Sequence, residues 1–188
     1  MLFRSRAVVT DHAGRALLFL DVDGTLLPHG GVPLDAAVVD WDEWQSQGNP
    51  RLAYLDHAHG PRLLALPCDL VWATAWMHDA NEVIAPLLGL PSLPVADLPD
   101  APLEDPVDTL HWKTKALVET ADGRPFVWVD DEISDIDRAW VSAHHRGHAL
   151  LYRVDASVGL TGADLIAIGG WLRDPDSAQR PGVADSFG

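Results

Sequence analysis

Four short runs of apolar residues divide the chain, and each is followed by polar or turn residues. The runs span residues 16–20, 70–73, 126–129 and 149–154. Near-continuous hydrophobicity over four to six residues is typical of a strand that is buried on both faces. A fifth, weaker candidate at residues 93–96 is flanked by prolines. The pattern therefore predicts a mostly parallel sheet of about five strands.

Segments with helical periodicity lie between the apolar runs. One starts at a capping-box pattern formed by Asp79 and Glu82 and is expected to end at Gly89. Another starts at Ser134 and Asp137 and carries three apolar residues at the spacing i, i+4 and i+7. These three residues are Ile136, Trp140 and Ala143. A last helix is expected over residues 162–172. Because strands and helices alternate, we expect a three-layer, Rossmann-like α/β domain.

The length and composition indicate one domain with a core of its own. The chain has 188 residues, of which 47% are hydrophobic and 22% are charged. We expect the domain to span residues 1–173, with a flexible start over residues 1–15. Residues 174–188 contain few large apolar side chains, so we expect a disordered tail there.

Several features bear on the compartment in which the protein works. No apolar run approaches the roughly 18 residues of a membrane-spanning helix, and the first ten residues make a poor signal peptide. The single cysteine, Cys68, excludes an intramolecular disulfide. We therefore expect a protein of the cytoplasm.

The charge balance is strongly acidic, with 28 acidic and 13 basic residues and a formal net charge of −15. Such a surface repels phosphate backbones and anionic lipids, so we expect neither general nucleic-acid binding nor membrane binding. Only two lysines occur, Lys113 and Lys115. A lysine in this chain is therefore a candidate for a functional role.

Polar side chains follow the predicted strands at the edge where parallel sheets bind their ligands. The residues that reach this edge are Asp21, Asp23, Thr74, Asp130, Asp131 and Asp135, together with Lys113 at the start of a helix. So many carboxylates destabilise one another unless a cation lies among them. Oxygen ligands without histidine or cysteine suit a hard cation, and the sequence predicts Mg²⁺.

The same residues carry a resemblance to a known superfamily. Residues 18–26, LFLDVDGTL, resemble the first motif (hhhhDxDGT) of the haloacid dehalogenase-like (HAD) hydrolases, and Thr74 matches the second, a strand that ends in Thr or Ser. Residues 113–117, KTKAL, are similar to the third motif, KGxAL, with Thr114 in place of the glycine. Residues 127–131, VWVDD, resemble the fourth motif, hhhDD. All four occur in the order found in the family.

Receiver domains of response regulators offer a competing interpretation, because they also combine an acidic pair, a phosphorylatable Asp, a Thr and a Lys. In those domains the acidic pair comes first and the lysine comes last. Here the Asp-x-Asp motif comes first and the acidic pair comes last. This order favours the hydrolase.

The resemblance implies a role for each carboxylate. Asp21 would be the nucleophile that forms an aspartyl-phosphate, and Asp23 would act as the general acid and base. Mg²⁺ would be held by Asp21, by the backbone carbonyl of Asp23 and by Asp130, with either Asp131 or Asp135 assisting. An acid at position 23 speaks against dehalogenation, since the dehalogenases of the superfamily lack it.

The resemblance also implies two side chains that would contact the phosphoryl group. Lys113 and Thr74 would bind its oxygens and stabilise charge in the transition state. Trp76 and Trp112 flank these two residues, so we expect one or both to line the substrate pocket.

The segments at the two places where the family inserts its caps, residues 26–69 and 98–110, are too short for a folded domain. The resemblance therefore implies a capless, Mg²⁺-dependent phosphomonoester hydrolase for a small or medium phosphorylated substrate. A phosphotransferase or phosphomutase, and a non-catalytic module that binds metal or phosphate, stay open as alternatives. The sequence fixes neither the substrate nor the oligomeric state.

Overall fold

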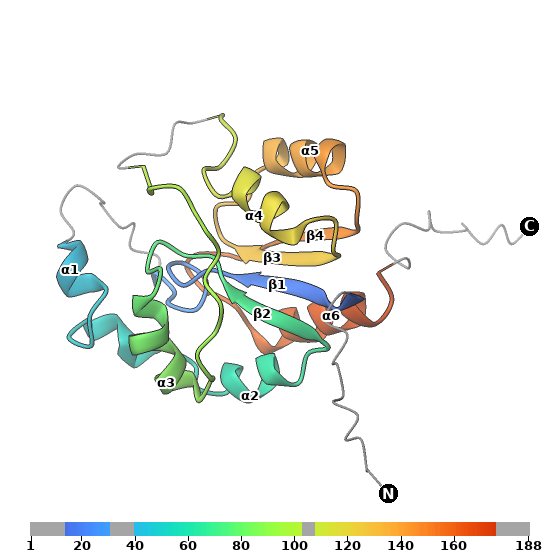
Figure 1. The fold of residues 1–188 in the computed structure, drawn as a ribbon. Helices are drawn as coiled ribbons and strands as arrows, with labels where there is room; N and C mark the ends of the chain where they lie inside the picture. Colours follow the sequence, from blue (N-terminus) through green and yellow to red (C-terminus); the bar gives the residue numbers. More distant parts are fainter. Residues whose placement is uncertain (1–13, 31–39, 103–107, 176–188) are drawn as a thin grey trace, which may run out of the picture.

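The computed structural model describes residues 14–30, 40–102 and 108–175. Its centre is a parallel sheet with the strand order β2-β1-β3-β4 (Figure 1). The strands are β1 (Ala16–Leu20), β2 (Cys68–Trp72), β3 (Phe126–Asp130) and β4 (Ala149–Arg153). Each starts within two residues of a predicted apolar run. The predicted mostly parallel α/β fold is therefore confirmed.

The register of the sheet aligns the carboxyl ends of its central strands. Leu20 at the end of β1 lies opposite Trp72 of β2 and Val129 of β3. The chain therefore leaves all three strands at one level, and the loops that follow them share one edge of the sheet.

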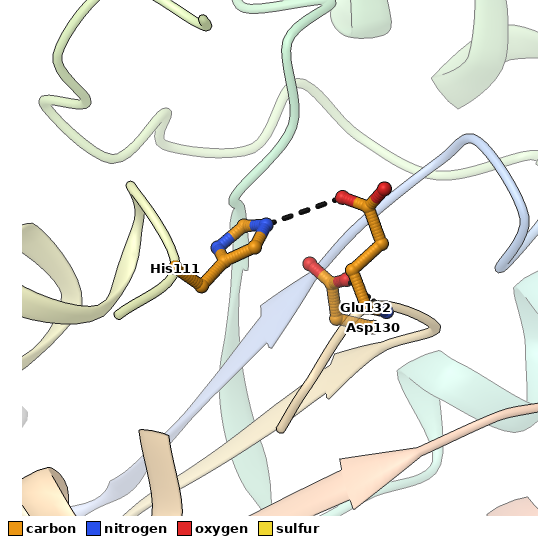
Figure 2. Close-up of side chains that lie close together, drawn as sticks. All are labelled: His111, Asp130 and Glu132. Atoms are coloured by element: carbon orange, nitrogen blue, oxygen red, sulfur yellow. Dashed lines mark hydrogen bonds and ion pairs between the residues drawn. The ribbon is translucent and has the colours of Figure 1, made fainter. Parts of the chain in front are cut away.

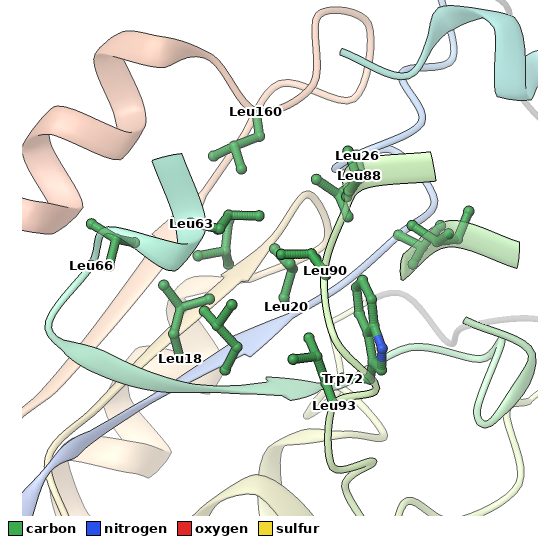
Figure 3. Close-up of a cluster of buried hydrophobic side chains, with 14 of the residues drawn as sticks. Leu18, Leu20, Leu26, Leu63, Leu66, Trp72, Leu88, Leu90, Leu93 and Leu160 are labelled. Carbon is green, nitrogen blue, oxygen red and sulfur yellow. The ribbon is translucent and has the colours of Figure 1, made fainter. Parts of the chain in front are cut away.

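Both faces of the sheet are covered, as near-continuous apolar strands require. Alternate β1 residues point to opposite faces, so Leu18 and Leu20 join one buried cluster while Leu17 and Phe19 join the other. The first cluster, part of which is drawn in Figure 3, packs under α2 (His59–Leu64), α3 (Ala85–Leu88) and α6 (Gly162–Arg173). The second packs under α4 (Thr114–Ala121) and α5 (Asp135–His144), on the opposite side of the sheet in Figure 1. This arrangement confirms the three layers.

The fifth predicted strand does not form. Only Val95 bridges Trp72, through a backbone hydrogen bond on each side: Trp72 N–H donates to the Pro94 carbonyl at 2.8 Å, and Ala96 N–H donates to the Trp72 carbonyl at 2.8 Å. Pro94 has no N–H to continue the ladder. In the described part of the chain the sheet thus has four strands, one fewer than predicted.

Of the two predicted capping boxes, one forms and the other does not. The box of Ser134 and Asp137 forms at the start of α5, although this helix buries Asp137 and Val141 rather than the predicted face. The box at Asp79 does not form, because the chain already turns helically there (φ −63°, ψ −24°) and continues as the π-helical turn η3 (Ala80–Ile84) into α3. Gly89 ends α3 as predicted, with a left-handed φ of 66°.

The described residues between the first two motifs form three short helices: α1 (Trp41–Trp44), η2 (Pro50–Tyr54) and α2. Leu55 and Leu63 of this segment lie in the first cluster, and Trp44 and Leu52 pack against it. These residues are therefore part of the core domain and form no separate cap. Residues 103–107, in the second predicted gap, lie outside the described residues.

The predicted domain limits stay predictions. Most of the expected flexible start and of the expected tail lies outside the described residues, which begin at residue 14 and end at residue 175. Of the described helices, none is long and apolar enough to cross a membrane.

Candidate active site

A tight turn after β1 presents the first two candidate carboxylates. The Val22 carbonyl accepts hydrogen bonds from the N–H groups of three residues, Thr25, Leu26 and Leu27, at 2.8–3.2 Å. Gly24 within this turn has a φ of +68°, and a Cβ added there would lie 2.4 Å from Cγ of Asp131. A glycine is required at this position because both the backbone conformation and the approach of the fourth motif exclude a side chain.

Lys113 lies between two of the carboxylates. Its Nζ donates to Oδ1 of Asp21 at 2.7 Å and to Oδ2 of Asp130 at 2.7 Å. All three residues are buried, so this is an ion triad with one positive and two negative groups. It joins the ends of β1 and β3 to the start of α4 across 92 residues of sequence.

The triad does not balance its own charge. Burial raises the pKa of Asp21 well above its ordinary value, and the Lys113 ammonium offsets this only in part. Burial also acts on Asp130, but Lys113 and hydrogen bonds hold the pKa of that carboxyl below its ordinary value. The pKa of Lys113 is raised, because the two carboxylates outweigh the effect of burial. When both carboxylates are ionised, the triad carries an excess of negative charge, which favours binding of a further cation.

A third carboxylate lies beside the triad. Asp21, Asp130 and Asp131 offer oxygen atoms that all lie within 4.8 Å of one another. Burial, and then the nearby charges of Asp130 and Glu132, raise the pKa of Asp131 to about 7. The side chain of Asp135, in contrast, is fully exposed and lies 3.8 Å from Arg138. Three converging carboxylates suit a hard divalent cation, and the geometry favours Asp131 over Asp135 as the assisting ligand.

Asp23 is held in a different way. Its Oδ1 accepts the indole N–H of Trp44 at 2.8 Å, and its Oδ2 accepts the indole N–H of Trp76 at 2.8 Å. Burial raises the pKa of Asp23, and the two indole hydrogen bonds oppose this rise. The carboxyl thus has two neutral partners, one on each oxygen.

The three remaining candidates from the sequence, Thr74, Trp76 and Trp112, have different environments in the structure. Thr74 is buried at the end of β2, where its hydroxyl accepts the backbone N–H of Trp76 at 3.3 Å. Trp76 itself is fully buried, with its N–H on Asp23. Trp112 is half-buried, and its ring centre lies 5.4 Å from Nζ of Lys113.

Three polar residues of the site were not identified from the sequence. Trp44 ends α1, and nothing in the sequence around it indicates a contact with Asp23. His111 lies 3.2 Å from Glu132, beside Asp130 (Figure 2). Because Nδ1 of His111 accepts the Lys113 backbone N–H at 3.3 Å, its Nε2 carries the proton and donates to Glu132.

Asp137 is the third such residue, and it joins the start of α4 to the start of α5. Its Oδ1 accepts the His111 N–H at 2.8 Å and the Thr114 hydroxyl at 2.7 Å. Its Oδ2 accepts the N–H of Ser134 at 2.8 Å and the hydroxyl of Ser134 at 2.6 Å. The Thr114 contact accounts for the threonine that replaces the glycine of the third motif.

An open pocket of about 550 Å³ adjoins the carboxylates at the carboxyl ends of β3 and β4. Its lining consists of Asp131, Glu132, Arg153, Val154, Asp155 and Ala156. Arg153 donates from Nε to the Asp131 backbone carbonyl at 2.9 Å, so its guanidinium forms one wall. The pocket provides room for a ligand next to the candidate metal ligands.

A comparison with known protein families agrees with this geometry. Residues 17–165 match the family described as HAD domain in Swiss Army Knife RNA repair proteins. This stretch is most of the chain and contains all four motifs. The chain belongs to this HAD family. No curated protein matches it.

Membership confirms the resemblance found in the sequence and decides against the receiver domain. This HAD domain is a hydrolase-type enzyme, and HAD domains generally use a divalent metal ion. The carboxylates of Asp21, Asp130 and Asp131 form a fitting set of ligands for such an ion.

Proposed function

We propose that this HAD domain hydrolyses phosphomonoesters in a Mg²⁺-dependent reaction, through an aspartyl-phosphate on Asp21. One observation carries the proposal: the buried ammonium of Lys113 lies 2.7 Å from both Asp21 and Asp130 at the ligand-binding edge of the sheet. Such a group holds an anionic nucleophile in place and offers positive charge to a phosphoryl group.

In the first step an oxygen of Asp21 attacks phosphorus. The new O–P bond forms as the bond to the leaving oxygen breaks, and Asp23 gives its proton to that oxygen. In the second step water attacks phosphorus, gives its proton to Asp23 and releases Asp21. The proton that Asp23 loses in the first step is thus restored in the second.

Two side chains would stabilise the phosphoryl oxygens during both steps. Lys113 uses two of its N–H groups on Asp21 and Asp130, which leaves the third for a phosphoryl oxygen. The Thr74 hydroxyl accepts the Trp76 N–H, so its hydrogen is left to donate. The half-buried ring of Trp112 lies beside Lys113 and would contact the substrate there.

The carboxylates of Asp21, Asp130 and Asp131, with the backbone carbonyl of Asp23, would hold Mg²⁺. The ion supplies positive charge that lets a phosphate dianion approach the Asp21 carboxylate. The geometry supports this assignment, because oxygen atoms of the three carboxylates all lie within 4.8 Å of one another.

The proposed substrate is a phosphomonoester of small or medium size. The family description names RNA repair, which makes the terminal phosphate of an RNA strand a specific candidate. The net charge of −15 weighs against binding along a polynucleotide, so recognition would be limited to the strand end.

The test is a metal-dependent phosphatase screen with Asp21→Asn as the blank. The panel contains small phosphomonoesters and short RNA strands with a 5′-phosphate, a 3′-phosphate or no terminal phosphate. We expect Mg²⁺-dependent release of inorganic phosphate from at least one member and none with the variant or in excess chelator. Transfer to an added alcohol instead of water would favour a phosphotransferase. Binding without release from any member would favour the non-catalytic module.

A further inference from the structure

Asp23 has an unusual environment for a carboxyl group at a charged site. Its two oxygens each accept one indole N–H, from Trp44 and from Trp76, and both distances are 2.8 Å. A carboxylate oxygen has two acceptor positions. Among the residues that the structure describes, each Asp23 oxygen therefore keeps one position for a proton, and the indoles determine where that position points.

Trp76 reaches Asp23 from the sheet. It follows β2 by four residues, is fully buried and donates its backbone N–H to Thr74. Its indole therefore has a fixed position relative to the strand end. This side of the contact is part of the core.

Trp44 reaches Asp23 from the other side, on the short helix α1. Three further interactions hold this segment: Asn49 Nδ2 donates to the Trp44 carbonyl at 2.8 Å, Gln45 Nε2 donates to the Ala75 carbonyl at 3.1 Å, and the Arg51 guanidinium lies 5.6 Å from the centre of the Trp44 ring. The segment is thereby bound to the loop after β2 as well as to Asp23.

We propose that Trp44 and Trp76 are positioning residues for Asp23, and that their paired N–H groups direct its proton at the leaving oxygen of the substrate. The inference rests on the proposed phosphomonoesterase. Held on both oxygens, the carboxyl group cannot rotate about its Cβ–Cγ bond without losing both hydrogen bonds. Neutral donors fix this orientation without adding a positive charge that would compete with Lys113 for the phosphoryl oxygens.

A buried indole N–H also needs a partner for stability alone. The test must therefore separate positioning from folding, and the leaving group does so. An alkoxide needs a proton to depart, whereas 4-nitrophenolate does not. A change that misdirects the Asp23 proton should therefore slow the release of an alkoxide but not the release of 4-nitrophenolate.

The experiment measures first-turnover release of the leaving group from glycerol phosphate and from 4-nitrophenyl phosphate, with Mg²⁺ present. Trp44→Phe keeps an aromatic ring but removes the N–H. We expect it to slow the alkyl substrate about tenfold, a fraction of the full effect of proton transfer, and the aryl substrate less than about twofold. Trp76→Phe should show the same difference between the two substrates.

The control is Trp140→Phe. Trp140 is half-buried on α5 and stacks on His144, away from Asp23. We expect it to change both rates by the same small factor. A Trp44→Phe variant that slows both substrates equally, or neither, would overturn the proposal. The double variant gives a further check, because Asp23→Asn leaves no proton to direct. If Trp44→Phe still slowed the alkyl substrate more than the aryl substrate in the Asp23→Asn background, the proposal would also be overturned.

A spectroscopic measurement tests the contact without substrate. The indole N–H signals of Trp44 and Trp76 are assigned by their loss in the two Phe variants. Both should move in Asp23→Asn while the Trp140 signal stays, and an unmoved pair would overturn the proposal. An active wild type whose Trp44→Phe variant slows both substrates equally, or neither, overturns the positioning role alone. A wild type without phosphatase activity overturns the proposed function, and the positioning role with it.

Discussion

Asp21 and Asp23 lie two residues apart on the same turn, yet the fold surrounds them with different partners. Asp21 accepts a hydrogen bond from a buried cation, Lys113, which it shares with Asp130. Asp23 accepts hydrogen bonds from two neutral indoles. A nearby cation lowers the free energy of keeping a buried carboxylate charged. Neutral donors fix the orientation of the carboxylate but stabilise its charge less. The difference matches the proposed roles of a nucleophile beside a cation and of an acid that gains and loses a proton.

Asp137 shows that neutral donors alone do not make a carboxyl a proton donor. Its oxygens accept four hydrogen bonds from His111, Thr114 and Ser134, so each oxygen has both acceptor positions filled. Although burial acts against it, these bonds hold the pKa of Asp137 below its ordinary value. Asp23 has half as many of these bonds and keeps two positions. The number of free positions, rather than the charge of the partners, separates the two groups.

Among the variants that test the contrast between Asp21 and Asp23, Asp23→Asn should have the largest effect on activity. The amide cannot donate or accept the proton, so turnover of an alkyl phosphate should fall by roughly 10²- to 10⁴-fold. An aryl phosphate should still release its phenol in a burst, because only the second step then lacks its base. Steady-state and burst kinetics on the two substrates provide the measurement. Asp122→Asn, at an exposed position, is the control. Equal losses on both substrates, without a burst, would mean that Asp23 is not the acid.

The second prediction concerns the cation. Lys113→Met leaves two buried carboxylates without their partner, so the free energy of unfolding should fall by roughly 3–5 kcal/mol in the absence of metal. Mg²⁺ should restore part of this loss, because it can take the place of the missing charge. Denaturant unfolding with and without Mg²⁺ measures both effects.

The other lysine of the chain is a matched control for this change. Lys115 lies two residues later and is exposed, so Lys115→Met should change the stability by about 0.5 kcal/mol or less. If the two variants were equally stable, the ion triad would contribute nothing to the fold, and the contrast between Asp21 and Asp23 would fail.

A smaller effect is expected from pH, through Asp131. With a pKa of about 7, this carboxyl is about half protonated at neutral pH and mostly protonated below it. Mg²⁺ binds the ionised form, so the affinity for Mg²⁺ should fall as the pH falls below 7, by at most about tenfold per pH unit for one proton. Calorimetric titration between pH 6 and 8 measures the slope. Asp131→Asn should flatten it, and an unchanged slope in that variant would place the titrating group elsewhere.

The sequence predicted those strands and helices whose pattern lies within a few consecutive residues. The near-continuous apolar residues of β1 and β3 gave both strands, since strands buried on two faces need no polar position. The order of the motifs then brought Asp21, Lys113 and Asp130 to one edge. The fifth strand failed where prolines removed backbone donors, and the box at Asp79 failed because the preceding turn was already helical.

The contacts that the sequence did not predict join distant segments. Trp44 reaches Asp23 across 21 residues, and His111 reaches Glu132 across the same separation. Neither contact leaves a periodic pattern, because it depends on how a short helix or loop packs on the sheet. Their role became visible only with the positions of the side chains.

The central claim is that Asp21 becomes phosphorylated, and reductive trapping tests it most directly. Borohydride converts an aspartyl-phosphate to homoserine, which peptide mass spectrometry locates. After a short incubation of the active protein with Mg²⁺ and the substrate found in the screen, we predict homoserine at position 21 and at no other aspartate. It should be absent when Mg²⁺ or substrate is omitted. Modification at another aspartate, or an active protein with none at Asp21, would contradict the account.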